Sequence, residues 1–262
     1  VAGGFDYRVA PALWSDGAAK ERFVVVPKGG RVWTTPDGDL RFPVGSVAVK
    51  TFAIAGRRIE TRLLVQHALD DWVGYSYEWN ADGTDASLLA GSKVVDLGND
   101  VRWTFPSSTD CTACHTPAAG YTLGPELRQV AGAFDAVAEG AQAVPQLPAL
   151  DDDAPVADRA RAYLHTNCSS CHRPGSATGL AELDLRVDTP LEATGLCGQA
   201  KAGTYGDHGA RLVVPGSPGI SVLVRRMRSV DATRMPKLAS RVVDEEGVAA
   251  VERWITSLGS CP

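Results

Sequence analysis

The chain has 262 residues, a formal net charge of −5 and 44% hydrophobic residues. Its length suggests one large domain or two modest ones, and its apolar content allows a packed core. An acidic chain without a basic stripe argues against nucleic acid as a partner. No apolar run approaches the length of a membrane span, so we expect no transmembrane segment in this chain.

Residues 1–105 are predicted to form a β-rich domain. Runs of β-branched and aromatic residues lie between turns that contain Pro and Gly, at 22–26, 47–52, 59–66 and 72–79. Several short strands at this spacing are typical of a sandwich or small barrel. In the last run an aromatic face alternates with small and polar residues, so we expect that face to be core: Val73, Tyr75, Tyr77 and Trp79.

Residues 106–150 form a second segment, in which the composition changes. It contains the pentapeptide Cys111-Thr112-Ala113-Cys114-His115. The stretch 126–138 is predicted to be one helix, because Pro125 stands near its start. The Pro- and Asp-rich stretch 144–153 is typical of a linker.

Residues 151–262 are predicted to be mainly helical. Helix starts are indicated at Pro155, at Ser217-Pro218 and at Asp244, and the last helix has one apolar face. The first of these helices leads into a second pentapeptide, Cys168-Ser169-Ser170-Cys171-His172.

Both pentapeptides read C-x-x-C-H, the attachment signature of a c-type haem. Two thiols two residues apart reach the two vinyl groups on one edge of a porphyrin, and the next His binds the iron from the proximal side. A thioredoxin-like site needs C-x-x-C without the His, and a structural zinc site would have to combine both motifs. We therefore predict two covalently bound haem c groups, on Cys111 and Cys114 with His115, and on Cys168 and Cys171 with His172.

Two cysteines remain outside the motifs, Cys197 and Cys261. An even remainder predicts a disulfide in an oxidising compartment, with two separate thiols as the alternative. Covalent haem attachment also takes place outside the cytoplasm. We therefore expect an exported protein, periplasmic or extracellular, that has lost its signal peptide.

The order helix, C-x-x-C-H, long loop, Arg234-Met235-Pro236 and terminal helix resembles a class I cytochrome c domain. The resemblance implies that Met235 is the distal iron ligand opposite His172. The only other methionine, Met227, lies in an apolar helical stretch and is the alternative. The expected fold is α+β and multidomain: an N-terminal β-sandwich-like domain followed by an all-α class I cytochrome c-like domain.

Nearly the full chain is also similar to a family of exported dihaem c-type cytochromes with a β-rich N-terminal domain. The stretches that carry this resemblance are 13–18, 42–45, 60–64, 74–80 and 124–129. The family resemblance implies a redox protein and no particular reaction.

The sixth ligand of the first haem is open on the sequence. His67 and His208 are candidates, and either would give a bis-His haem of lower potential than the His/Met haem. If neither binds, the iron is five-coordinate and open to a small ligand. Arg128 is a candidate partner for a haem propionate, because guanidinium groups pair with carboxylates.

The leading functional hypothesis is an electron-transfer relay between redox partner proteins. The rival is a dihaem peroxidase or oxidase with an open first haem, although no motif supplies distal acid–base groups and we predict no catalytic residue. A third reading is a structural subunit whose aromatic strand 72–79 binds a partner or a glycan. The sequence does not identify the partners or the oligomeric state.

Overall fold

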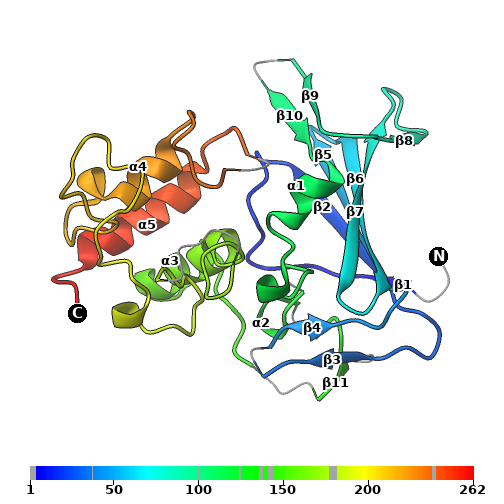
Figure 1. Ribbon diagram of the computed structural model, residues 1–262, viewed down its shortest axis with the longest axis horizontal. Coiled ribbons are helices and arrows are strands. Elements are labelled where there is room, and N and C mark those ends of the chain that lie inside the picture. The colour runs from blue at the N-terminus through cyan, green and yellow to red at the C-terminus, as the bar shows by residue number, and fades with distance from the viewer. Residues whose placement is uncertain are drawn as a thin grey trace. The chain divides into compact units, whose positions relative to one another are not determined.

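The computed structural model describes residues 4–36, 38–98, 101–123, 125–130, 132–135, 138–140, 144–176, 182–237 and 240–262. The chain divides into two compact units, and Figure 1 labels the elements of both. The first unit comprises residues 1–10 and 17–146, and the second comprises residues 11–16 and 147–262. The segment that carries the first motif thus belongs to the first unit.

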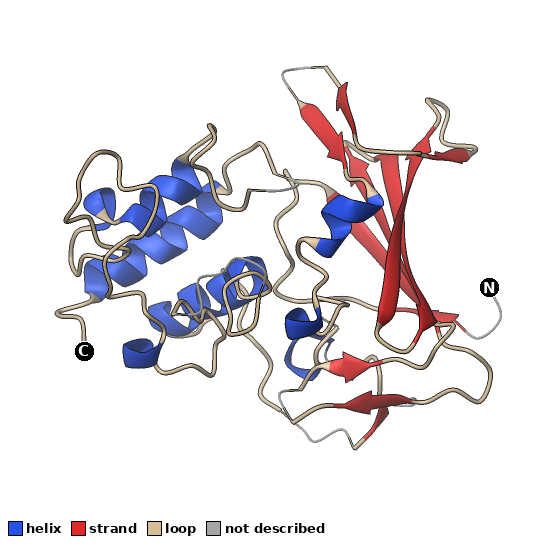
Figure 2. Ribbon diagram, viewed as in Figure 1, coloured by secondary structure: helices blue, strands red, loops and turns tan. Residues whose placement is uncertain are grey.

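The first unit is built on a six-stranded antiparallel sheet (Figure 2). Its strands, in spatial order, are β1 (Gly4–Asp6), β2 (Ala19–Val25), β5 (Val47–Ile54), β6 (Arg57–Ala68), β7 (Asp71–Trp79) and β8 (Ala86–Leu88). The four strands predicted from β-branched and aromatic runs are confirmed, as β2, β5, β6 and β7.

Smaller elements complete the first unit. Two further sheets contain β3 (Val32–Thr34), β4 (Leu40–Arg41) and β11 (Ala138–Glu139), and β9 (Lys93–Asp96) and β10 (Arg102–Phe105). The helical pieces are α1 (Ser108–Thr112), the 3₁₀-helix Pro117–Ala119 and α2 (Leu127–Val130). The predicted helix over 126–138 is wrong beyond α2. Gly132 adopts a left-handed conformation with φ +77°, which ends helices rather than continuing them.

The prediction that the aromatic face of β7 forms core is wrong. Gly74 and Ser76 on the opposite face are buried, whereas Tyr75 and Tyr77 are only half-buried. The cause is α1, which packs against β7 on the face of Gly74.

The second unit contains three α-helices separated by long loops. They are α3 (Val156–Cys168), α4 (Val222–Arg228) and α5 (Glu245–Ser257), with 3₁₀-helices at Leu191–Ala193 and Pro218–Ile220. α3 and α5 pack closely where a Cβ on Gly247 would overlap the ring of Tyr163. Asp244 caps α5 by accepting a hydrogen bond from the Gly247 N–H at 3.0 Å.

The predicted fold class is corrected by these elements. The first unit has one six-stranded sheet with two small sheets of two and three strands, not two comparable sheets that face each other. The second unit is mostly loop, with helices of 13, 7 and 13 residues, so no all-α class I cytochrome c-like domain is evident. The physical reason is that Gly and Pro recur through 174–219 and break helical periodicity there.

None of the helices in the described part of the chain has both the length and the apolar character needed to span a bilayer.

Candidate functional site

The two C-x-x-C-H motifs have the same backbone conformation. In the first, the N–H groups of Cys114 and His115 donate to the Cys111 carbonyl at 3.2 and 2.9 Å. In the second, the corresponding N–H groups donate to the Cys168 carbonyl at 3.1 and 2.9 Å. Each motif is therefore one helical turn, which places two thiols and one imidazole around a short stretch of chain.

The motif thiols are not joined in disulfides, and burial raises the pKa of two of them. None of the four motif cysteines is in a disulfide. Burial raises the pKa of Cys168 to about 12, with a further contribution from Cys171, and burial also raises the pKa of Cys111. A thioredoxin-like site needs the opposite shift, a thiol pKa lowered toward neutrality. The thiol environment thus disfavours dithiol–disulfide exchange as the use of these motifs.

The first motif is held by a capped helix on the sheet. Ser107 and Asp110 form a capping box at the start of α1: Ser107 Oγ accepts from the Asp110 N–H at 3.1 Å, and the Asp110 carboxylate accepts from the Ser107 N–H at 2.9 Å. A Cβ added to Gly74 would lie 2.6 Å from Cys111 Sγ. The missing side chain of Gly74 therefore makes room for the first thiol against β7.

One ring nitrogen of His115 is hydrogen-bonded to the backbone, and the imidazole is neutral. Its Nδ1 is hydrogen-bonded to the Tyr121 carbonyl, which can only accept, so Nδ1 carries the proton and Nε2 keeps its lone pair. Burial lowers the pKa of His115 to about 4, against the backbone hydrogen bond to Tyr121, and the charges of Lys50 and Arg62 lower it further. The imidazole is thus neutral at physiological pH, the form that binds metals.

Of the sequence-predicted partners of the first haem, His67 is not brought together with His115. His67 is exposed at the end of β6, where its Nε2 is hydrogen-bonded to Tyr75 Oη at 2.9 Å. Tyr75 lies on the face of the sheet opposite Gly74 and Cys111, so His67 faces away from the first motif. Arg128 lies on α2 and is half-buried, whereas the cations that act on His115 are Lys50 and Arg62.

His208 lies in the second unit, exposed on a Gly-rich loop.

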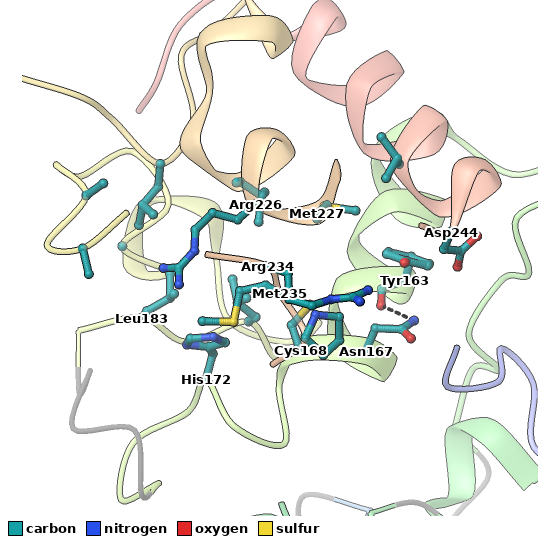
Figure 3. A pocket seen from close by; sticks show the side chains of 18 of the residues that line it. Tyr163, Asn167, Cys168, His172, Leu183, Arg226, Met227, Arg234, Met235 and Asp244 are labelled. Atoms are coloured by element: carbon teal, nitrogen blue, oxygen red, sulfur yellow. Dashed lines mark hydrogen bonds between the residues drawn. The ribbon is translucent and has the colours of Figure 1, made fainter. Parts of the chain in front are cut away.

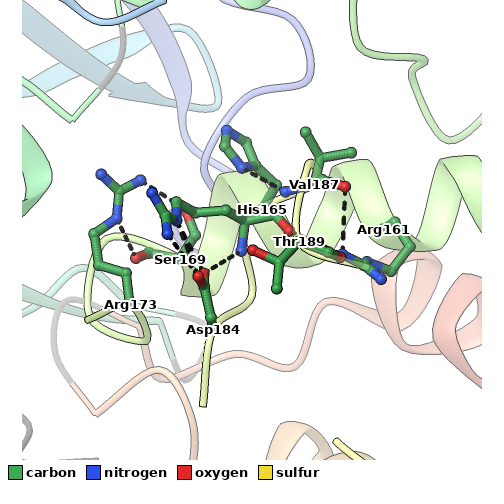
Figure 4. A network of polar contacts seen from close by, with 8 residues as sticks. Arg161, His165, Ser169, Arg173, Asp184, Val187 and Thr189 are labelled. Carbon is green, nitrogen blue, oxygen red and sulfur yellow. Dashed lines mark hydrogen bonds and ion pairs between the residues drawn. The ribbon is translucent and has the colours of Figure 1, made fainter. Parts of the chain in front are cut away.

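The second motif ends α3 and is fixed by a loop that returns to the same helix (Figure 4). The Arg161 guanidinium donates to the carbonyls of Arg186 and Thr189 at 2.8 and 2.6 Å. The Val187 N–H donates to His165 Nδ1 at 3.1 Å, which gives the buried His165 a structural role. These bonds hold the loop 184–189 against the last turns of α3, and the Leu185 N–H donates to the His172 carbonyl at 2.9 Å.

A cavity of about 570 Å³ opens beside the second motif and lies within the second unit. Its lining includes Cys168, His172 and Met235. Figure 3 shows the Met235 side chain beside the His172 imidazole. His172 is buried, and its Nδ1 has no hydrogen-bond partner among the described residues. Burial lowers the pKa of His172, as does the charge of Arg226, so the imidazole is neutral.

The loop that carries Met235 is tied to α4. The Met235 N–H donates to the Arg226 carbonyl at 2.9 Å, and Arg226 Nε donates to the Thr233 carbonyl at 2.8 Å. The alternative ligand, Met227, also borders the cavity but belongs to the buried core of the unit. Both methionines thus border the cavity, Met227 from the helix α4 and Met235 from the loop that follows it.

The cavity wall includes residues that the sequence analysis did not identify. The Trp14 N–H donates to Asn167 Oδ1 at 2.7 Å, and Trp14 Nε1 donates to the Val242 carbonyl at 3.0 Å. Asp16 accepts from the backbone N–H groups of Arg241 and Val242 at 2.7 and 2.9 Å. In the sequence, the stretch 13–18 was noted only because it carries the family resemblance, and no role was assigned to it. In the structure, Trp14 and Asp16 of this stretch hold the loop beside the cavity.

Arg234 adds a polar group to the same cavity. Its side chain is buried, and Nε has no hydrogen-bond partner among the described residues, although Nη2 donates to Ser240 Oγ at 3.1 Å. Burial lowers the pKa of Arg234, and the charge of Asp16 opposes this shift. A buried donor without an acceptor costs about 1–3 kcal/mol, so the site is complete only with an acceptor there.

The residues present fit a covalently bound haem at the second motif. The volume lies within the range of about 300–1,000 Å³ typical of ligand cavities, and the lining is rich in apolar side chains. Orphaned polar atoms of His172 and Arg234 lie at this cavity. Within the described ranges no group of three His, Cys, Asp or Glu side chains is placed so that it could hold a metal ion.

The two cysteines outside the motifs, Cys197 and Cys261, are joined by a disulfide whose Cα atoms are 5.8 Å apart.

Comparison with known proteins adds no relationship. No protein-family model matches the chain, and no curated protein or solved structure is significantly similar to it.

Proposed function

We propose that this protein is an exported dihaem c-type cytochrome that relays electrons between redox partner proteins. The observation that carries the proposal is the shared turn of the two C-x-x-C-H motifs, each with reduced thiols and a neutral imidazole. Haem iron, when bound, supplies reversible one-electron exchange. The two cysteines of each motif would attach the group, and His115 and His172 would bind its iron.

The second site is proposed as the coordinatively closed one. His172 and Met235 lie side by side at one cavity, which supports their roles as proximal and distal ligands. A thioether is a soft ligand that favours Fe(II), so this haem has the higher potential of a His/Met pair. A closed iron passes electrons and binds no substrate. The Cys197–Cys261 disulfide supports export, because disulfides persist in oxidising compartments.

Intact-mass measurement of the purified chain tests the proposal. We expect two haem additions, one lost with the pair Cys111→Ala and Cys114→Ala and the other lost with Cys168→Ala and Cys171→Ala. The pair Cys197→Ser and Cys261→Ser is the control and should keep both additions. A wild-type chain that carries no haem when produced with a complete haem-attachment system contradicts the proposal.

A second candidate is an enzyme of the peroxidase or oxidase type with an open first haem. The observation that favours it concerns the first unit, whose only His residues are His67 and His115 and which contains no Met. Since His67 faces away from the first motif, this unit supplies no His or Met as sixth ligand.

The spin state of the first haem separates the two candidates. Electron paramagnetic resonance of the oxidised protein measures the spin state of the iron. Steady-state kinetics with a reduced dye as electron donor measure the rate of peroxide reduction. The relay predicts reversible one-electron exchange at two resolved potentials and little turnover with peroxide. High-spin iron with fast, saturable peroxide reduction establishes the enzyme instead.

A further inference from the structure

Three cations stand side by side on the buried face of the main sheet. The antiparallel register pairs Arg22 of β2 with Lys50 of β5, and Lys50 with Arg62 of β6. We name these residues the cation row. Like charges directly opposite each other on neighbouring strands repel and destabilise the sheet. A row of three therefore requires compensation by negative charge.

The protein compensates only part of this charge. Glu60 is fully buried and pairs with Arg62 through two hydrogen bonds of 2.8 Å, while it also accepts from Trp103 Nε1 at 2.9 Å. Among the described residues, neither Arg22 nor Lys50 forms an ion pair with a carboxylate. One buried carboxylate thus serves three cations.

The surroundings of Lys50 show how strongly it lacks a counter-charge. Its Nζ lies 5.0 Å from the centroid of the Phe52 ring, and the Arg62 guanidinium lies 4.6 Å from the same centroid. Burial lowers the pKa of Lys50 well below its ordinary value, and the charges of Arg22, Arg62 and Lys20 lower it further. The charge of Glu60 opposes this shift. A charge on this packed face without a partner is costly, so the row suits an anion in addition to the one carboxylate that the described residues supply.

The cation row leads to the first haem motif. Arg62 stands opposite Ser76 of β7, whose hydroxyl donates to the Pro106 carbonyl at 2.9 Å just before α1. Gly74, two residues from Ser76 on the same face, contacts Cys111. An anionic group attached at Cys111 and Cys114 is thus within electrostatic range of the row.

We propose that the cation row binds the carboxylate groups of the haem attached at Cys111 and Cys114, and that its charge raises the reduction potential of that haem. The inference rests on the proposed function, since it requires haem at the first motif. Guanidinium and ammonium groups are the natural partners of carboxylates, and Arg binds them through two parallel bonds. Positive charge near iron favours the reduced form, which carries one positive charge fewer.

Binding by the cation row would alter both the expected carboxylate partner and the expected potential of the first haem. The row takes the role that was assigned to Arg128, and the first haem has a higher potential than its lack of a Met ligand implies. The register across three strands carries this assignment, since the three residues lie far apart in the chain.

The test compares three variants of the holoprotein by redox titration and intact mass. Lys50→Met removes the charge at nearly constant size and Lys50→Arg keeps it. Lys28→Met removes the same charge from an exposed turn of the same unit and serves as the matched control. We expect both haems to remain in all three. In Lys50→Met alone, the oxidised-to-reduced ratio of one haem should rise about tenfold at fixed poise, a fall of about 59 mV in its potential.

Each other outcome has a distinct meaning. A wild-type chain without haem at the first motif contradicts the proposed function. If Lys50→Met keeps two haems with unchanged potentials, the role of the cation row is overturned and the proposed function stands. A change of one haem from low to high spin in this variant also overturns that role, because Lys50 would then be an iron ligand. A saturable shift of the wild-type potential by inorganic phosphate, lost in Lys50→Met, also overturns it, because the row then binds a dissociable anion. Arg22→Met repeats the test if Lys50→Met does not fold.

Discussion

Met235 and Met227 both border the cavity beside His172, but their surroundings differ. Met227 is packed in the core, whereas Met235 lies on a loop beside the imidazole. Because a thioether favours Fe(II), we expect Met235→Ala to abolish the thioether-to-iron absorption band of the oxidised protein and to lower one midpoint potential. Optical spectra and redox titration measure the two effects.

Met227→Leu is the matched control for this substitution, since volume-conserving exchanges in a core usually cost less than about 1.5 kcal/mol. It should leave the band in place. A band that survives in Met235→Ala and disappears in Met227→Leu would assign the ligand to Met227.

At the scale of single residues, the sequence could predict the groups whose spacing carries their chemistry. The Cys197–Cys261 disulfide is confirmed, and haem attachment at the two motifs stays a prediction. It could not predict Lys50 or Gly74, because their roles come from strand register and from the helix that packs on β7. His67 was a candidate ligand on the sequence, but it faces away from the first motif, because successive side chains of a strand point to opposite faces of the sheet.

At the scale of elements, the loop 240–242 depends on one carboxylate from the start of the chain. Asp16 accepts two backbone N–H groups of this loop and the Ser240 hydroxyl, the last at 2.9 Å. Hydrogen bonds to charged groups contribute about 1.5–3 kcal/mol, so we expect Asp16→Ala to destabilise the second unit by about 2 kcal/mol or more. Urea denaturation measures the loss, and the thioether band should weaken with it.

Two variants make this measurement specific. Asp153→Ala removes an exposed carboxylate in the same unit and should leave stability unchanged. Asp16 has a positive φ of 51°, which Gly adopts without strain but Ala does not, so Asp16→Gly, which also lacks the carboxylate, separates backbone strain from lost acceptors. An Asp16→Ala variant with wild-type stability would show that the loop holds itself in place.

Elements were predictable where one pattern persists over several turns or strands. The terminal helix α5 follows its apolar periodicity and its Asp244 cap, and β5 to β7 follow their β-branched and aromatic runs. The stretch 126–138 has helix-forming composition but is interrupted at Gly132, where the backbone turns. The all-α expectation failed for the same reason, because a family resemblance was extended over loops rich in Gly and Pro.

At the scale of the whole molecule, the Cys197–Cys261 disulfide closes much of the second unit into one loop. The two cysteines are 64 residues apart in the chain. In the chain-entropy model a loop of this length stabilises the folded state by about 4 kcal/mol. We expect Cys197→Ser combined with Cys261→Ser to lower the unfolding free energy of the second unit by that order, as measured by urea denaturation.

Alkylation supplies the complementary observation. Neither cysteine should be labelled before reduction, and a reductant should destabilise the wild-type protein but not the double variant. Labelling of both cysteines in natively purified protein would rule out the bond.

The segment 11–16 lies in the chain between β1 and β2 of the first unit's main sheet, yet it belongs to the second unit. Trp14 meets Asn167, a residue 153 positions later, and Asp16 meets Arg241 after 225. During synthesis, residues 11–16 leave the ribosome early, but their partners Asn167 and Arg241 are made much later. The gene therefore cannot be cut at residue 147 into two self-sufficient halves: a fragment that starts there keeps Cys168, His172 and Met235 but lacks a wall of their cavity.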